Sequence, residues 1–338
     1  MNMLGRHIRT ILFSAAALFS VFFVPVSISG PNAEKTVKVS KNDTAITLSC
    51  GGSKILSYHH AVHPVPEGVD PSYRRSGFIH PLYSPSGKVL TRIQPPDHYH
   101  HYGSWAPWTK THIDGREVDF WNLGKKQGTV RFAELISKEA GGFTVHQEHV
   151  EFTDSGGERV VIDEILRIHA SAAEIDGIPA WIVDVSGTLK NILDAAIIMD
   201  KYRYGGGIAI RAAKEWKAPG SNILSSEGKD RDNGRASRAR WCEVFGTFDD
   251  GTRSGILFMS HPDNREHPEP IYMWDSKANG GRGDMFFQFC PIHLNPWQLN
   301  PGAEYKLRYR MVIYDGKLNT ERMEILWQTF AEHQTFSE

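Results

Sequence analysis

The chain has 338 residues, of which 40% are hydrophobic and 23% are charged, and its formal net charge at pH 7 is −1. This is the ordinary composition of a folded globular protein. A nucleic-acid binder needs a basic surface that neutralises phosphates, so this near-neutral charge predicts no nucleic-acid partner.

The first residues have the pattern of a secretory signal. Basic residues precede an apolar run from Ile11 to Val26, which ends in small residues. We expect residues 1–30 to be a signal peptide that is cleaved near Ser29–Ala33. An uncleaved N-terminal anchor is the alternative, because the run is long for a signal. Cleavage predicts a periplasmic or extracellular protein without a later membrane span, folded as a single domain over residues 31–338.

After this segment the pattern is overwhelmingly that of β-strands. Two alternating stretches, Arg159–Ala172 and Ala180–Asn191, flank an Asp176–Gly177 turn and predict a long hairpin. Further strands are expected at residues 36–40, 45–49, 54–59, 77–83, 129–137, 143–152, 202–211, 240–248, 255–260, 271–274, 285–292 and 305–314. One helix is expected after the N-cap Asn319. The prediction is an all-β fold, a large two-sheet β-sandwich with few helices and one of them near the C-terminus.

Three local features add detail to the predicted fold. The triplet Gly205–Gly207 lacks the Lys-Ser/Thr pair of a phosphate loop, so it predicts a bulge or a close backbone approach. Residues 218–239 are polar and rich in turn formers, which predicts a long surface loop. Cys50, Cys242 and Cys290 are widely spaced and odd in number, which favours buried thiols over a disulfide framework.

The densest chemistry lies between Gln94 and Trp121, which hold four of the chain's 16 histidines and three of its nine tryptophans. If the run is extended, His98 and His100 point to one face and His101 to the other. Such a pair can hold a divalent metal when further ligands arrive from elsewhere. Alternatively, an imidazole that titrates near pH 7 serves as general acid or base. Structural bonds to backbone are the third interpretation, but the density favours a site.

A carboxylate on a core face offers a partner for these histidines. Glu164 shares one face of its predicted strand with Ile162 and Leu166. A carboxylate placed among core residues must be paired, protonated or functional, because burying it alone costs free energy. A position at the open end of the sheet, bonded to Arg167, is the alternative.

Aromatic and charged residues in and beyond this stretch suit a sugar. Tryptophans offer flat apolar faces and one N–H donor, although core packing explains them equally well. An arginine can clamp a carboxylate, and a polar loop after a buried strand often carries function. The candidates for substrate binding are His80, Trp105, Asp119, Trp121, Arg211 and His261.

Several motifs resemble a known family. The stretches FIHPLYSPSGKVLTR, PPDHYHHYGSWAPW and DGREVDFW, with YGGGIAIRA and FMSHPDNREHP later, resemble the bacterial PmoA-like family of uncharacterised proteins. The resemblance covers residues 77–316. It implies a β-supersandwich similar to galactose mutarotase, in an exported carbohydrate-active protein, rather than a membrane-bound methane oxygenase, because no internal span is found.

The resemblance also implies roles for particular residues. In mutarotase-like enzymes, histidine and carboxylate side chains do acid–base work on a sugar, which points here to His98, His101 and Glu164. The family pattern HPHHRGLW is HYHHYGSW in this chain. Tyr99 and Tyr102 therefore mark the places where this chain departs from its relatives.

These observations predict an exported carbohydrate-active enzyme, a hydrolase or lyase that acts on an oligosaccharide or modified sugar. His98 or His101 would be the acid or base, with Glu164 as its partner. No cofactor is expected. One alternative is a non-catalytic carbohydrate-binding protein, and the other is a metal-dependent enzyme that binds a divalent ion through His98 and His100.

Overall fold

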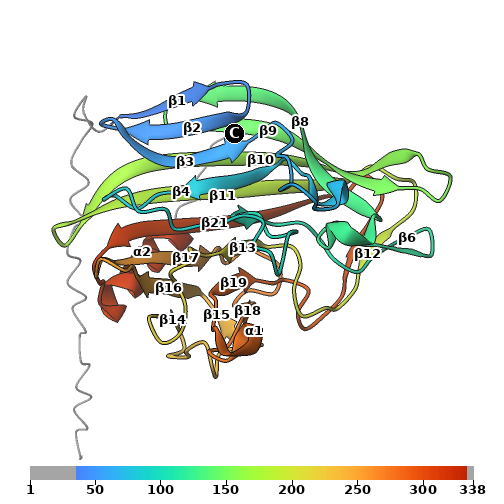
Figure 1. Cartoon of the computed structure of the whole chain (residues 1–338). Coiled ribbons are helices and arrows are strands. Elements are labelled where there is room, and N and C mark those ends of the chain that lie inside the picture. Colours follow the sequence, from blue (N-terminus) through green and yellow to red (C-terminus); the bar gives the residue numbers. More distant parts are fainter. Residues whose placement is uncertain (1–35, 333–338) are drawn as a thin grey trace, which may run out of the picture. The chain divides into compact units, whose positions relative to one another are not determined.

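The computed structural model describes residues 36–332, which form three sheets (Figure 1). The nine-stranded sheet contains, in spatial order, β1 (Val37–Lys41), β2 (Ala45–Cys50), β3 (Ser53–His59), β4 (Phe78–Leu82), β5 (Ser104–Trp105), β13 (Ile208–Arg211), β19 (Phe286–Phe289), β18 (Glu269–Met273) and β15 (Arg238–Ala239). The eight-stranded sheet contains β14 (Ser221–Ser225), β16 (Trp241–Thr247), β17 (Arg253–Ser260), β21 (Glu304–Asp315), β11 (Ile178–Asn191), β10 (Glu158–Ile175), β9 (Gly142–Phe152) and β8 (Gly128–Glu139). The small sheet contains β20 (Trp297–Leu299), β12 (Ile197–Met199), β6 (Thr111–Ile113) and β7 (Arg116–Val118). The predicted signal peptide lies outside the described residues.

The main core fills the space between the two large sheets. Alternation decides which residues enter it: on β13, Ile208 and Ile210 join this core, whereas Ala209 belongs to a second cluster on the outer face. On β10, Ile162 and Ile168 face the same core. The all-β sandwich predicted from the sequence is confirmed.

A helix covers the outer face of the eight-stranded sheet. Helix α2 (Thr320–Glu332) packs Met323 and Phe330 against Trp241 of β16 and Met259 of β17. The Asn319 side chain accepts a hydrogen bond from the Arg322 backbone at 2.7 Å, so the predicted N-cap is confirmed. Besides α2 there is a four-residue helix α1 (Ala278–Gly281) and the 3₁₀ turns η2 (Pro71–Tyr73) and η3 (Leu123–Lys125).

The long hairpin has the predicted turn. Ile175 pairs with Ile178, which leaves Asp176 and Gly177 as the two loop residues. Both have a positive φ, 52° and 80°, as a tight two-residue hairpin turn requires.

The glycine triplet lies just before β13 and makes this strand shorter than predicted. The expected strand over residues 202–211 begins only at Ile208, because Gly205, Gly206 and Gly207 all have positive φ. A Cβ at Gly206 would lie 1.8 Å from the Trp108 ring. The predicted close backbone approach is therefore confirmed, and it makes room for a tryptophan.

The predicted surface loop over residues 218–239 is partly wrong. It contains strands β14 and β15, and Arg231 within it is only 2% exposed. A buried guanidinium can hold several carbonyls at once, which a polar composition does not reveal.

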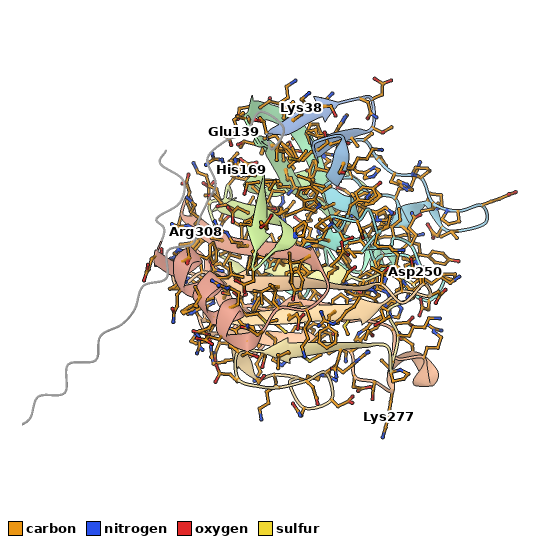
Figure 2. The ribbon with its side chains drawn as sticks, turned by 90° about the vertical axis from the view of Figure 1, so that its left-hand side faces the viewer. Lys38, Glu139, His169, Asp250, Lys277 and Arg308 are labelled. Atoms are coloured by element: carbon orange, nitrogen blue, oxygen red, sulfur yellow. The ribbon has the colours of Figure 1, made fainter. Side chains whose placement is uncertain are left out.

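Many charged side chains lie on the outside of the described chain. Lys38, Glu139, Asp250 and Lys277 are exposed and lie at the periphery (Figure 2). Cys50, Cys242 and Cys290 are buried, as predicted. Among residues 36–332, no helix is long and apolar enough to cross a membrane.

Candidate functional site

A pocket of about 220 Å³ lies on the outer face of the nine-stranded sheet. Register explains what lies beneath it: Trp105 pairs with Ala209, and Arg211 pairs with Phe286, so all four side chains share the face on which the pocket lies, and Phe286 lines it. We call this the histidine pocket, and its lining consists of His98, His100, His101, Trp121, Asn122, Arg203, Tyr204, Tyr272, Trp274 and Phe286.

The three histidines reach the pocket from turns and not from a strand. The backbone amide of His98 donates to the Pro95 carbonyl at 2.8 Å, and the amide of His101 donates to the His98 carbonyl at 2.9 Å. The extended geometry considered from the sequence is therefore wrong. Because the chain turns twice, the rings of His98 and His100 both lie near His101, at centroid distances of 4.8 and 4.7 Å.

Burial keeps these imidazoles neutral near pH 7. It lowers the pKa of His98, lowers that of His100 to about 4, and brings that of His101 well below 6.5. His101 is only 3% exposed and lies under rings of Trp105 and Trp274, at 5.1 and 5.5 Å. His98 is the more accessible, with 27% of its side chain exposed.

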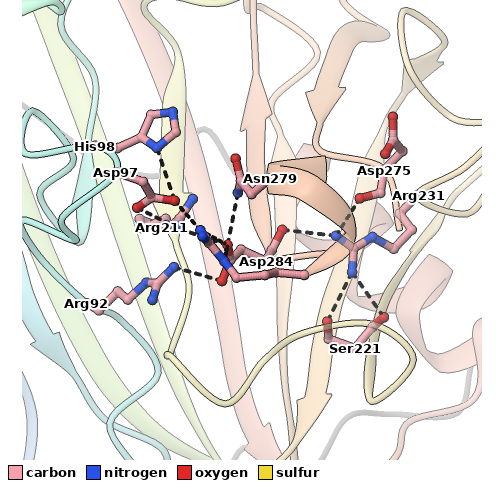
Figure 3. Close-up of polar contacts among 10 residues, drawn as sticks. Arg92, Asp97, His98, Arg211, Ser221, Arg231, Asp275, Asn279 and Asp284 are labelled. Carbon is pink, nitrogen blue, oxygen red and sulfur yellow. Dashed lines mark hydrogen bonds and ion pairs between the residues drawn. The ribbon is translucent and has the colours of Figure 1, made fainter. Parts of the chain in front are cut away.

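A carboxylate lies behind His98. The Asp97 carboxylate lies 3.5 Å from His98 Nδ1, and it is ion-paired with Arg282 (Figure 3). Burial alone would raise the pKa of Asp97, but Arg211, Arg282 and His98 outweigh it and the pKa is lowered. Asp97 thus stays ionised, and this arrangement leaves Nε2 of His98 for a ligand.

Three arginines and a second aspartate support this carboxylate. Asp284 is ion-paired with Arg92 at 3.0 Å and with Arg282 at 2.7 Å (Figure 3). Arg211 lies between the two acids, 3.6 Å from Asp284 and 3.9 Å from Asp97, and its side chain is fully buried. Burial, followed by the charge of Arg92, lowers the pKa of Arg211 to about 9, so it remains a cation at neutral pH.

Arg231 anchors the backbone on which Trp274 and Asp284 stand. Its guanidinium donates to the carbonyls of Asp275 and Asp284, both at 3.0 Å (Figure 3). It also donates to the carbonyl of Trp274 at 3.1 Å. One buried side chain therefore joins the pocket wall formed by Trp274 to the backbone of the Asp284 ion-pair cluster.

The structure does not bring Glu164 to these histidines. Glu164 faces the inner side of the eight-stranded sheet, and its Oε2 lies 2.9 Å from Nε2 of His149. The nine-stranded sheet lies between it and the histidine pocket, so the pairing expected with His98 or His101 is not formed. Strand alternation placed Glu164 on the core face correctly, but alternation in one sheet does not reveal which face of the other sheet carries the histidines.

Five of the six substrate-binding candidates lie outside the lining of the pocket. Trp105 and Arg211 pack directly behind it, against His101 at 5.1 Å and Trp274 at 4.3 Å, and the other three lie elsewhere. His80 forms a hydrogen bond with Thr91, with 2.9 Å between Nδ1 and Oγ1, and burial lowers the pKa of His80 to about 4. Asp119 is fully buried and accepts hydrogen bonds from the backbone of Trp121 and Asn122. His261 lies at the other large sheet, with its ring 5.3 Å from that of Phe330 in α2.

The two tyrosines that depart from the resemblance have structural contacts. The Tyr102 hydroxyl donates to the Tyr73 carbonyl at 2.5 Å and accepts from Gln94 at 2.6 Å. The Tyr99 ring contacts the Tyr73 ring at 5.7 Å. Neither tyrosine lines the histidine pocket.

Several lining residues were not predicted. Trp274 directly follows β18 and was assigned only as the end of a strand, although it is two residues beyond Tyr272 and so shares its face. Asp97, which lies behind His98 and outside the lining, was not predicted either; its place next to the histidine run was the available signal. Asn122, Arg203 and Tyr204 come from connections whose path no local pattern specifies.

No metal centre is evident in the described range. Among residues 36–332, no group of three or more His, Cys, Asp or Glu side chains is arranged to hold a metal ion. Use of a metal by His98 and His100 remains an untested prediction.

The fold and site define a β-sandwich protein with an aromatic, histidine-bearing pocket on one sheet. The chain belongs to a family of unknown function, DUF6807, whose model matches residues 45–328. The resemblance to a PmoA-like family was wrong, because the matching model is that of this uncharacterised family. No curated protein matches the sequence.

Similar solved structures include carbohydrate-related proteins. Heparan sulfate lyase HepC from Pedobacter heparinus is 8% identical with a TM-score of 0.32, over 85% of this chain and 36% of the lyase. A galactose mutarotase related enzyme from Lactobacillus acidophilus is 9% identical with a TM-score of 0.38, over 82% of this chain and 97% of that one. The α-galactosidase AgaB from Geobacillus stearothermophilus is 10% identical with a TM-score of 0.38, over 85% and 42%. This chain thus spans about a third of the lyase, and such values establish nothing about its activity.

Proposed function

We propose that the histidine pocket binds a carbohydrate and that His98 acts on it as a general base or acid. The observation that carries this proposal is a single cavity in which neutral imidazoles adjoin the rings of Trp121, Tyr272 and Trp274. Sugar rings have apolar C–H faces edged by hydroxyls, so they stack on aromatic rings while imidazoles and amides bond their edges.

His98 is the preferred catalytic group because of its surroundings. Its lowered pKa makes it a free base at neutral pH, and Asp97 at 3.5 Å from Nδ1 would stabilise the imidazolium that forms on proton transfer. His101 is almost fully buried, so its proposed role is to support the ring of His98. Asn122 and Arg203 offer polar groups that would orient hydroxyls.

The reaction class proposed is hydrolysis or elimination at a glycosidic linkage, in an exported protein as the N-terminal pattern predicts. Glu164 has no part in this site, so the second proton-transfer group would come from the pocket itself. Tyr204, whose pKa is raised by burial, would remain protonated and could donate.

The test is a turnover screen on oligosaccharides, followed by His98→Asn on any substrate found. Loss of His98 should lower kcat by about 100-fold or more while ligand affinity changes little. His112→Asn is the matched control, since His112 is a half-exposed histidine paired with Asp200. Trp274→Ala should instead weaken binding.

Two outcomes would contradict the proposal. Full turnover in both His98→Asn and His101→Asn would exclude histidine catalysis. Saturable binding of an oligosaccharide with no turnover, unchanged between about pH 5 and pH 8, would favour a non-catalytic carbohydrate-binding protein.

A further inference from the structure

A second cavity lies between the two large sheets, behind the sheet that carries the histidine pocket. Its volume is about 60 Å³, several times the minimum that one water molecule needs. Leu166 and Val185 point into the main core yet remain only partly buried, as expected of residues beside an open space. We call this the inter-sheet cavity, and the polar side chains that line it include Tyr58, Arg75, Gln147 and Glu164.

One carboxylate oxygen of Glu164 is bonded to His149, and the other lies beside the cavity. Oε2 lies 2.9 Å from Nε2 of His149, which is fully buried. Oε1 lies beside Gly187, where an added Cβ would approach it to 2.8 Å. Because Gly187 also lines the cavity, the absence of a side chain there gives the free oxygen access to it.

Arg75 faces the same cavity with an unused donor. It is 2% exposed, and its Nε donates to the Ser76 carbonyl at 3.2 Å. In the described part of the chain, its Nη1 has no hydrogen-bond partner. Burial lowers the pKa of Arg75 to about 10, so it is still a cation at neutral pH. A buried charged donor without an acceptor costs free energy, which an acceptor in the cavity would recover.

We propose that the inter-sheet cavity is a second ligand site, and that it takes a small neutral polyol. An acceptor is needed for Arg75 and a donor for Glu164, and a hydroxyl group supplies both. The opposite charges of these two residues balance, so a neutral ligand is favoured over an ion. Apolar walls such as Leu166 and Leu189 suit its C–H groups.

The size of the ligand follows from the volume. At about 60 Å³ the cavity exceeds the minimum for one water several-fold but remains small, which favours a compact ligand such as a three-carbon polyol. This site does not depend on the function proposed for His98, because the two cavities open on opposite faces of the nine-stranded sheet.

The experiment uses the whole chain labelled with 5-fluorotryptophan and followed by fluorine NMR during a glycerol titration. Trp108 lines the inter-sheet cavity, whereas Trp121 and Trp274 line the histidine pocket and report on that site. We expect a saturable shift of the Trp108 resonance at millimolar glycerol, as a six-atom ligand allows, without a matching saturable shift at Trp274.

Two substitutions then test the assigned groups. Glu164→Gln and Arg75→Met should each weaken the glycerol response at Trp108 about ten-fold or more. Glu174→Gln is the control, because it makes the same change at an exposed position of the same strand. It should leave the response unchanged.

Three results would overturn the proposal: no saturable shift at Trp108, an unchanged response in both variants, or saturation by acetate in place of glycerol. The wild-type comparison of glycerol with acetate decides the matter even if a variant fails to fold. A failure here leaves the turnover test of His98 untouched, so the two proposals are distinguishable.

Discussion

The guanidinium carbon of Arg211 lies 4.3 Å from the ring centroid of Trp274. The same indole lies 4.8 Å from the ring of His98 and 5.5 Å from that of His101. Trp274 therefore connects the buried Arg–Asp cluster to the imidazoles, and the cluster determines where this wall of the pocket stands.

Loss of Arg211 should be costly for stability. Arg211→Met leaves Asp97 and Asp284 with one cation fewer in a buried setting, which should lower the free energy of unfolding by about 3 kcal/mol. Denaturant unfolding measures this. The control is Arg235→Met, which removes an exposed arginine that lies 4.9 Å from the Tyr272 ring and should cost less than about 1 kcal/mol. Equal costs for the two variants would contradict the role assigned to Arg211.

The glycine triplet allows a steric test with a matched conformation. Gly206→Ala should lower the free energy of unfolding by about 3 kcal/mol or more, since its Cβ would meet the Trp108 ring at 1.8 Å. Gly156 has a similar positive φ, 80° against 69°, but has open space around it. Gly156→Ala should therefore cost about 1 kcal/mol from the backbone alone. The difference between the two melting curves isolates the packing contribution.

The free energy of unfolding should fall as the pH is lowered below the ordinary pKa of a histidine. Burial lowers the pKa values of His80 and His100 from 6.5 to about 4. Between these values the unfolded chain binds protons that the folded chain does not. The stabilisation that comes from keeping these two imidazoles neutral is fully present above about pH 6.5 and is lost as the pH falls toward about 4.

Chemical unfolding at several pH values checks this dependence. His100→Gln should make the loss of stability on acidification smaller, because it removes one of the imidazoles that burial holds neutral. An equal loss of stability on acidification in His100→Gln and in the unmodified chain would show that His100 is not held neutral.

Chelation tests the metal-dependent alternative. The described residues lack a group of three or more metal-ligating side chains, so EDTA should change the melting temperature by less than about 2 °C. Elemental analysis of untagged protein provides the independent measurement. One tightly bound transition metal per chain would contradict this expectation.

Much of the fold could be predicted because residues alternate between the two faces of a strand, which gives the longer strands a period of two in the sequence. Alternating residues marked β9, β10, β11 and β21, and Asp176–Gly177 marked a two-residue turn. Short strands such as β5 and β12 were missed, since two or three residues cannot display a period. The prediction of a surface loop over residues 218–239 was partly wrong, because a polar composition does not reveal that the Arg231 guanidinium is buried.

The candidate site was only partly predictable, for the same reason. The dense His–Trp run located His98, His101, Trp105 and Trp121 near one another in the chain and in space. Trp274 joins them from more than 150 residues further along, where nothing local marks it as functional.

By itself, the sequence determined the β-sandwich class, the closing helix, the tight turns and the segment that carries the imidazoles, because all of these follow from short-range patterns. Only the tertiary structure decided that Trp274 completes the histidine pocket with Arg211 packed behind it, and that Glu164 pairs with His149 and lines a different cavity. The physical reason is that strand order and sheet packing bring distant segments together, and a local period records which residues share a face but not which sheet that face will meet.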